Sequence, residues 1–106
     1  MITLQGFSHY YRDPRMLDIV IQGGDVSLHA YPPGGGKGHS MTLPLAQLRD
    51  AVRYGYGTIN SRQTDHACEI ETRGTELLLK FSASGSGSGS GSWWIDIDRE
   101  RLSAAL

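Results

Sequence analysis

Asp18 and His29 are the two residues of this sequence best placed for acid–base chemistry. They lie in two runs of alternating apolar residues separated by Gly23-Gly24, a spacing typical of a tight β-hairpin. Pairing outward from these glycines sets Asp18 opposite His29, where a carboxylate and an imidazole could exchange a proton. A hydrolase would also need a nucleophile, and Ser27 lies on a strand without the sharp turn that exposes one. We therefore interpret the pair as a solvated cross-strand contact.

The other titratable residues are expected to have structural roles. The four histidines lack the compact spacing of metal ligands, so we expect neither a metal nor a cofactor. They are His9, His29, His39 and His66. Asp96, Asp98 and Glu100 form an acidic patch in which Asp98 caps a following helix and the rest lies at a solvated edge. The single cysteine, Cys68, excludes an internal disulfide and is expected to be a small buried apolar residue.

Three segments predict β-structure. Residues 16–31 form a first hairpin, residues 66–82 form a second that turns at Arg73-Gly74, and residues 93–98 alternate like a further strand. The segment before the first hairpin, ITLQGFSHYY, reads as another strand that is broken or bulged near Gly6. Asp13-Pro14 is expected to turn the chain from this strand into the hairpin.

One main helix is expected over residues 44–54, since Pro44 suits a first helical position. Leu45, Leu48 and Val52 then form a narrow apolar stripe, and a short C-terminal helix follows Asp98.

The glycine-rich segment before the main helix, PPGGGKGHS, lacks the spacing of a Walker phosphate-binding motif and is interpreted as a mobile loop. The predicted fold class is therefore α+β, an antiparallel sheet of five to six strands packed by one main helix and the short C-terminal helix.

The 106 residues are expected to form a single domain, residues 1–106. Between residues 84 and 92, serine and glycine alternate without a break, a pattern that carries no turn chemistry. We interpret this run as an engineered linker that replaces a longer native loop, and a natural low-complexity loop is the alternative. Any function held by a replaced loop would be missing from the chain.

The charge of the chain argues against a partner that is bound mainly through its phosphates. The formal net charge is −1, whereas a binder driven by phosphate contacts is usually basic.

The N-terminus lacks the basic and apolar regions of a signal peptide, and no apolar run reaches the length of a membrane span. We therefore expect a cytoplasmic protein that does not contact a membrane.

The first functional hypothesis is a small non-enzymatic protein that binds another protein. Its anchors would be Trp94, which strand alternation sets on the face opposite Trp93, together with Asp96, Tyr31, His29 and Asp18. In size, charge and element content the chain resembles bacterial immunity proteins and phage-encoded inhibitors, although no shared motif supports that resemblance. A homodimer formed through edge strands is also expected to be feasible.

The alternative hypothesis is a module that binds single-stranded nucleic acid on a sheet face. Aromatic and cationic residues that could stack on bases and contact phosphates are Tyr10, Tyr11, Arg12, Arg15 and Lys37. Each hairpin leads on to a helix, and in this plan alone the chain resembles the Whirly family and the transcriptional coactivators that bind single strands on a curved sheet. The acidic charge balance favours the first hypothesis.

Overall fold

The computed structural model describes residues 1–36, 38–62, 66–83 and 93–106. The strands are β1 (Ile2–Ser8), β2 (Asp13–Gln22), β3 (Asp25–Tyr31), β4 (His39–Pro44), β5 (Tyr56–Asn60), β6 (His66–Arg73), β7 (Glu76–Ala83) and β8 (Trp93–Asp98), and the helices are α1 (Leu45–Tyr54) and α2 (Arg99–Ala105). The engineered-linker interpretation of residues 84–92 lies outside the described residues, as does Lys37.

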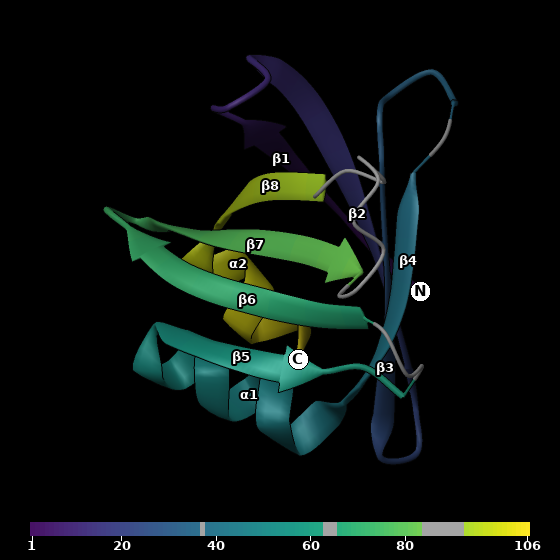
Figure 1. The fold of residues 1–106 in the computed structure, drawn as a ribbon, viewed down its shortest axis with the longest axis vertical. Coiled ribbons are helices and arrows are strands. Elements are labelled where there is room, and N and C mark those ends of the chain that lie inside the picture. Colours follow the sequence, from purple (N-terminus) through teal and green to yellow (C-terminus); the bar gives the residue numbers. More distant parts are fainter. Residues whose placement is uncertain (37, 63–65, 84–92) are drawn as a thin grey trace.

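All the described strands belong to one antiparallel sheet in the order β4-β3-β2-β1-β8-β7-β6-β5. In Figure 1, β5, β6 and β7 run across the view while β3 and β4 run upright, so the sheet coils steeply. Its two edges approach each other, and Arg62 N donates a hydrogen bond of 2.9 Å to Thr42 O. The sheet is therefore a nearly closed barrel with two small helices.

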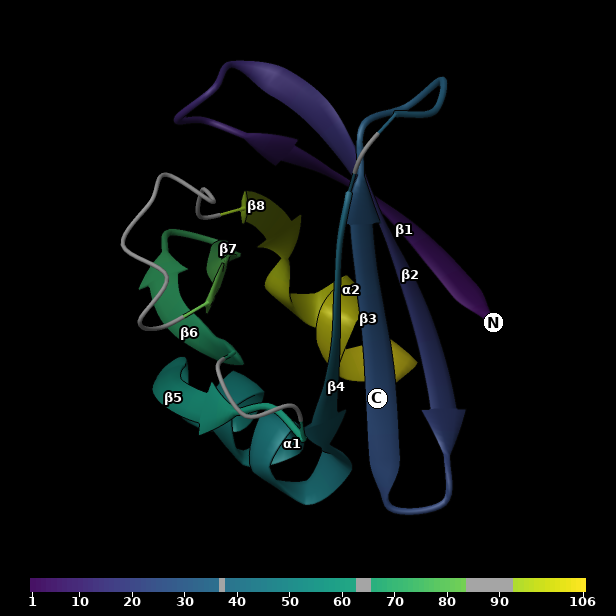
Figure 2. The ribbon, with the colours of Figure 1, turned by 45° about the vertical axis from the view of Figure 1, so that its right-hand side comes forward.

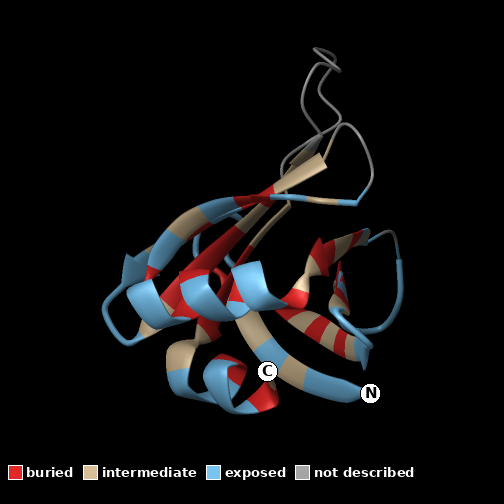
Figure 3. Ribbon diagram, turned by 90° about the horizontal axis from the view of Figure 1, so that it is seen from below, coloured by how far each residue is buried: buried red, intermediate tan, exposed pale blue. Residues whose placement is uncertain are grey.

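The chain repeats one plan, four antiparallel strands followed by a helix, in residues 2–54 and again in residues 56–105. Both helices lie on the same side of the barrel (Figures 2 and 3). Buried positions alternate along β2, β3 and β4, whereas β7 and β8 each bury three consecutive residues. The outer faces of the helices are exposed (Figure 3). Leucine, isoleucine and valine from both repeats and both helices form one hydrophobic core, which makes the chain a single small domain.

Helix α1 matches the expected apolar stripe. Leu45, Leu48, Ala51 and Val52 are buried against the sheet, and the opposite side faces solvent. The helix ends at Gly55, whose φ of 87° places it in the left-handed region that glycine adopts without steric cost. Asp98 caps α2 as expected, because its carboxylate accepts a hydrogen bond from Arg101 N.

The two hairpins differ in how well the sequence predicts their register. The first has the expected pairing, with Gln22 opposite Asp25 and Asp18 opposite His29. The second is offset by two residues, because its turn is Gly74-Thr75 instead of Arg73-Gly74. Glu71 consequently lies opposite Leu78 and avoids the repulsion that the expected register would have placed against Glu76. A shift of two residues leaves every side chain on its expected face.

The expected fold class, five to six strands packed by a main helix, was wrong. The structure adds β4 and β5, the two edge strands on either side of α1, and the sheet curls around its own core. Strand β4 was missed because its first residues, His39 and Ser40, end the segment PPGGGKGHS that was interpreted as a loop, and because its last residue, Pro44, directly precedes the helix. Strand β5 was missed because it contains Gly57 and buries one apolar residue, Ile59. The turn expected at Asp13-Pro14 was also wrong, since both residues begin β2.

No helix in the described part of the chain combines the length and apolar character that crossing a membrane requires.

The two repeats join where β1 pairs with β8 in the sheet. The pairing between these strands consists of Phe7 opposite Asp96. The neighbouring Gly6 lies so close to β8 that a Cβ atom added to it would be 2.6 Å from Asp96 O. Glycine is required here because the backbones approach each other closely, and the bulge expected at Gly6 is instead a continuous strand.

We predict that Gly6→Ala destabilises the fold by about 1–3 kcal/mol, because the added methyl group pushes β1 away from β8. Urea unfolding measures the change. Gly24→Ala is the matched control, since a Cβ atom at Gly24 would meet nothing within 4 Å. Equal unfolding free energies for the two variants would contradict the close-approach explanation.

Candidate functional site

Aromatic and cationic side chains gather where the β1–β2 turn crosses β7 and β8. The residues of this aromatic–cation cluster are Tyr10, Tyr11, Arg15, Lys80, Trp93 and Trp94. They come from the turn, the start of β2, the end of β7 and the start of β8. Segments far apart in the chain thus supply one site, which the pairing of β1 with β8 brings together.

Arg15 is the centre of the cluster. It shares the inward face of β2 with Leu17 and is 7% exposed. Its Cζ atom lies 4.5 Å from the ring centroid of Tyr11 and 3.9 Å from that of Trp93, so the guanidinium contacts two aromatic rings. Its Nη1 donates to Trp94 O over 3.1 Å, and its Nε donates to Asp13 Oδ1 over 2.9 Å. The buried cation is therefore paired with a carboxylate, a main-chain oxygen and two aromatic rings, and it positions those rings.

The outer layer of the cluster presents tyrosines to solvent. Tyr10 lies 4.7 Å from Trp94 and 4.8 Å from Tyr11, measured between ring centroids, yet the two tyrosines are 66% and 47% exposed. Lys80 Nζ lies 4.8 Å from the Trp94 ring centroid and 2.6 Å from Glu71 Oε1. The hydrogen bond from Lys80 lowers the pKa of the Glu71 carboxyl. Aromatic surface is thus held in place while much of it remains accessible.

A tight turn holds Tyr10 and Tyr11 in this position. Arg12 N donates to Ser8 O over 2.6 Å, and Tyr11 N donates to the buried Ser8 hydroxyl over 3.2 Å. Arg12 has a φ of 60°, a conformation in which a non-glycine residue is strained. Its side chain is exposed, and no partner is found for its guanidinium in the described ranges. The turn therefore offers one outward cation beside the two tyrosines.

Asp96 and Trp94 do not form the exposed anchor pair that the sequence suggested. Asp96 is 2% exposed, and its Oδ2 accepts a hydrogen bond of 3.0 Å from His9 N, which fastens the turn to β8. Trp94 is half-buried beneath Tyr10. The expectation that Asp96 lies at a solvated edge was wrong because the turn folds over the outer face of β8.

Asp18 and His29 are cross-strand neighbours on the outer face of the first repeat, but no hydrogen bond joins them. Asp18 Oδ1 accepts from Thr3 Oγ1 over 2.7 Å and from Tyr31 OH over 3.1 Å. His29 Nδ1 lies 2.5 Å from Ser40 Oγ, and the His29 and Tyr31 rings stack at 5.1 Å. Desolvation, with the hydrogen bond to Asp18, raises the pKa of Tyr31. The carboxylate does not orient the imidazole, so the set lacks the geometry of a catalytic triad.

His39 and His66 meet beside Phe81, a contact that sequence reasoning missed together with β4. The two imidazole centroids are 5.5 Å apart, and His39 stacks on Phe81 at 6.0 Å. Within the described residues, His39 Nε2 and His66 Nδ1 are buried without a hydrogen-bond partner. Desolvation and the neighbouring His66 lower the pKa of His39. The described ranges hold no group of three or more histidine, cysteine or acidic residues that could bind a metal.

Sequence reasoning named three members of the cluster, Tyr10, Tyr11 and Arg15, among its nucleic-acid candidates and Trp94 among its protein-binding candidates. Trp93, expected on the face opposite Trp94, packs against the core while its ring also contacts Arg15. Lys80 was not considered, although the alternation of β7 places it on the outer face beside Trp94. Comparison of the chain with protein-family models, curated proteins and solved structures gives no match.

We predict that Arg15→Lys destabilises the fold by about 1–3 kcal/mol and shifts tryptophan emission to longer wavelength. Lysine keeps the charge, but it lacks the planar guanidinium that contacts both rings and donates the two hydrogen bonds. Chemical unfolding followed by tryptophan fluorescence measures both effects. Arg101→Lys, at an exposed position of α2, is the control, and equal stability of both variants would contradict the central role of Arg15.

We also predict that His39 makes the fold sensitive to mild acid. The pKa of His39 is lower in the folded chain than its ordinary value, so the unfolded chain binds the proton more readily. Unfolding free energy should therefore fall as the pH drops below about 6.5, the ordinary pKa of histidine. His39→Gln should lose less stability than the unmodified chain between pH 7 and pH 5 in urea titrations. Parallel pH profiles would contradict this assignment.

Proposed function

We propose that the protein binds single-stranded nucleic acid at the aromatic–cation cluster. The observation that carries the proposal is the pair of exposed tyrosines held against a rigid set of rings around Arg15. Proteins that bind single strands without sequence preference use aromatic side chains on which successive bases stack, beside cations that contact the backbone. Tyr10 and Tyr11 would stack on bases, and Arg12 would contact a phosphate.

Stacking would supply most of the affinity. The chain has a net charge of −1, Arg15 is committed to internal contacts, and Lys80 is paired with Glu71. Arg12 is then the cation of the turn that remains available for a phosphate. Each contacted phosphate changes log K by about 0.7 for every tenfold change in salt on single strands. We therefore expect binding that is weakly salt-dependent, unlike that of a strongly basic protein.

A protein partner is the competing hypothesis, and the geometry gives it less support. Of the five anchors expected for it, Asp96 is buried and Trp94 lies beneath Tyr10. Tyr31, His29 and Asp18 lie on the outer face of the first repeat and are joined to its polar side chains. The five residues therefore form no single surface. Both repeats consist of strands followed by a helix. In this order of elements alone, each repeat resembles Whirly proteins.

We predict that a short oligothymidylate quenches the fluorescence of the protein and that Tyr10→Ala weakens its binding about 5- to 150-fold, the cost of losing one stacked base. The chain contains two tryptophans, Trp93 and Trp94, and both belong to the cluster, so the emission reports directly on this site. Oligonucleotide concentrations up to about 100 μM cover the range of weak non-specific binding.

Tyr54→Ala is the matched control, because Tyr54 is 67% exposed on α1 and belongs to another surface. Arg12→Gly separates charge from folding, since it removes the cation while relieving the strained φ. It should lower the salt dependence without lowering stability. Absence of quenching, equal losses for Tyr10→Ala and Tyr54→Ala, or equal binding of duplex DNA would overturn the proposal, and the first of these would favour a protein partner.

A further inference from the structure

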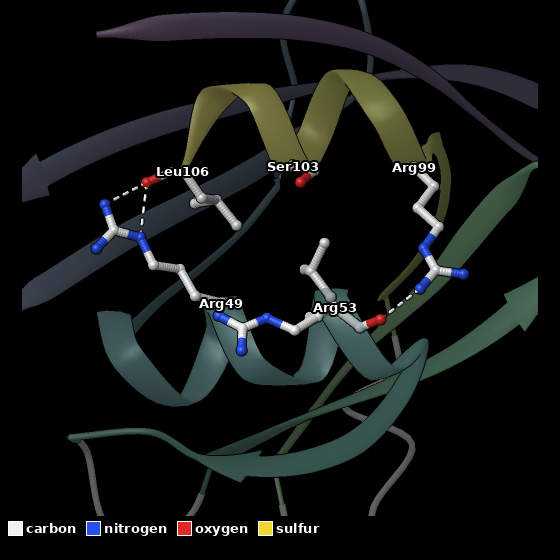
Figure 4. A pocket seen from close by; sticks show the side chains of 6 residues that line it. Arg49, Arg53, Arg99, Ser103 and Leu106 are labelled. Atoms are coloured by element: carbon white, nitrogen blue, oxygen red, sulfur yellow. Dashed lines mark hydrogen bonds between the residues drawn. The ribbon is translucent and has the colours of Figure 1, made fainter.

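A pocket between α1 and α2 is lined by three arginines, on elements that contribute nothing to the aromatic–cation cluster (Figure 4). Its volume is about 420 Å³, which is within the range of small-molecule sites. Its lining residues are Arg49, Val52, Arg53, Arg99, Ser103 and Leu106. It therefore combines guanidinium groups, a hydroxyl and two apolar side chains, and no acidic residue is among the described residues of its lining.

Two of the arginines have structural partners. Arg49 donates from Nε over 2.7 Å and from Nη2 to the main-chain oxygen of Leu106. Arg99 Nη2 donates over 2.6 Å to Arg53 O, a carbonyl in the last turn of α1 that has no partner within that helix. These bonds tie α1 to α2 and leave the remaining N–H groups of both arginines available.

Arg53 has no such explanation. Arg53 belongs to the lining of the pocket, and its guanidinium has no hydrogen bond or ion pair in the described part of the chain. The same ranges contain no ion pair between a carboxylate and Arg49 or Arg99. Asp50 lines another hollow, and Asp98 and Glu100 line a third one that shares Arg99 with this pocket. Among the described residues, Arg49 and Arg53 therefore face the pocket without a carboxylate side chain in its lining.

We propose that this pocket binds the phosphate group of a small phosphate monoester. Three guanidinium groups and the Ser103 hydroxyl offer more donors than one carboxylate can accept, whereas a phosphate has three terminal oxygens and nearly two negative charges. The apolar surface of Val52 and Leu106 would contact the organic part of the ester. Figure 4 shows the Ser103 hydroxyl on the side of α2 that faces α1, between Arg49 and Arg99.

The test uses phenyl phosphate and inorganic phosphate as probes, with sodium chloride at equal ionic strength as the reference. Ligands that bind the folded state raise its apparent stability. We expect both phosphates to raise the melting temperature of the full chain above the chloride reference, and phenyl phosphate to bind more tightly. Isothermal titration calorimetry gives the dissociation constants. Equal melting temperatures in phosphate and chloride would overturn the proposal.

Arg53→Gln should weaken phosphate binding about tenfold or more, the effect of losing a charged hydrogen-bond donor. The fold should stay intact, because the Arg53 side chain has no hydrogen bond or ion pair with another described residue. Arg101→Gln makes the same change of charge on an exposed position of α2 outside the pocket and should leave binding unchanged. Equal losses in the two variants would show a general charge effect and would overturn the assignment.

Discussion

The close approach of β1 to β8 is the constraint on which the rest of the molecule depends. At Gly6 the two backbones come within a distance that no side chain allows, and Phe7 pairs with Asp96. This contact turns two four-stranded meanders into one coiled sheet. It also carries the β1–β2 turn across the outer face of β8, where His9 N binds Asp96 and Tyr10 covers Trp94.

The aromatic–cation cluster and the coiled sheet therefore both depend on the pairing of β1 with β8. Arg15 points inward with the core residues of β2, so its charge is compensated by aromatic faces, a main-chain oxygen and Asp13. Burying an arginine is costly unless the charge is paired and hydrogen-bonded, and Arg15 has both kinds of partner. The contacts of Arg15 position the rings of Tyr11 and Trp93. The tight turn leaves Tyr10 and Tyr11 exposed at the surface.

Local patterns in the sequence predicted much of the fold, whereas contacts between distant segments could not be derived from them. The Gly23-Gly24 hairpin, helix α1 and the Asp98 cap each depend on neighbours within a few residues, and all were predicted. The edge strands β4 and β5 have few apolar residues of their own and exist because the sheet pairs with them. The contact of Arg15 with Trp93 joins residues 78 positions apart, so alternation could name both residues without indicating that they meet.

The connectivity of the strands also affects the order in which we expect the chain to fold. Of the pairings between described strands, all but that of β1 with β8 join strands that follow each other along the chain. Pairings between neighbours close short loops, whereas the pairing of Phe7 with Asp96 must close almost the whole chain and bears the largest entropic cost. We therefore expect each meander to form from its own hairpins and the docking of β1 on β8 to complete the barrel last. The contacts of Arg15 with Trp93 and of Tyr10 with Trp94 join the two repeats, so we expect a partly folded chain to have its repeats without its complete site.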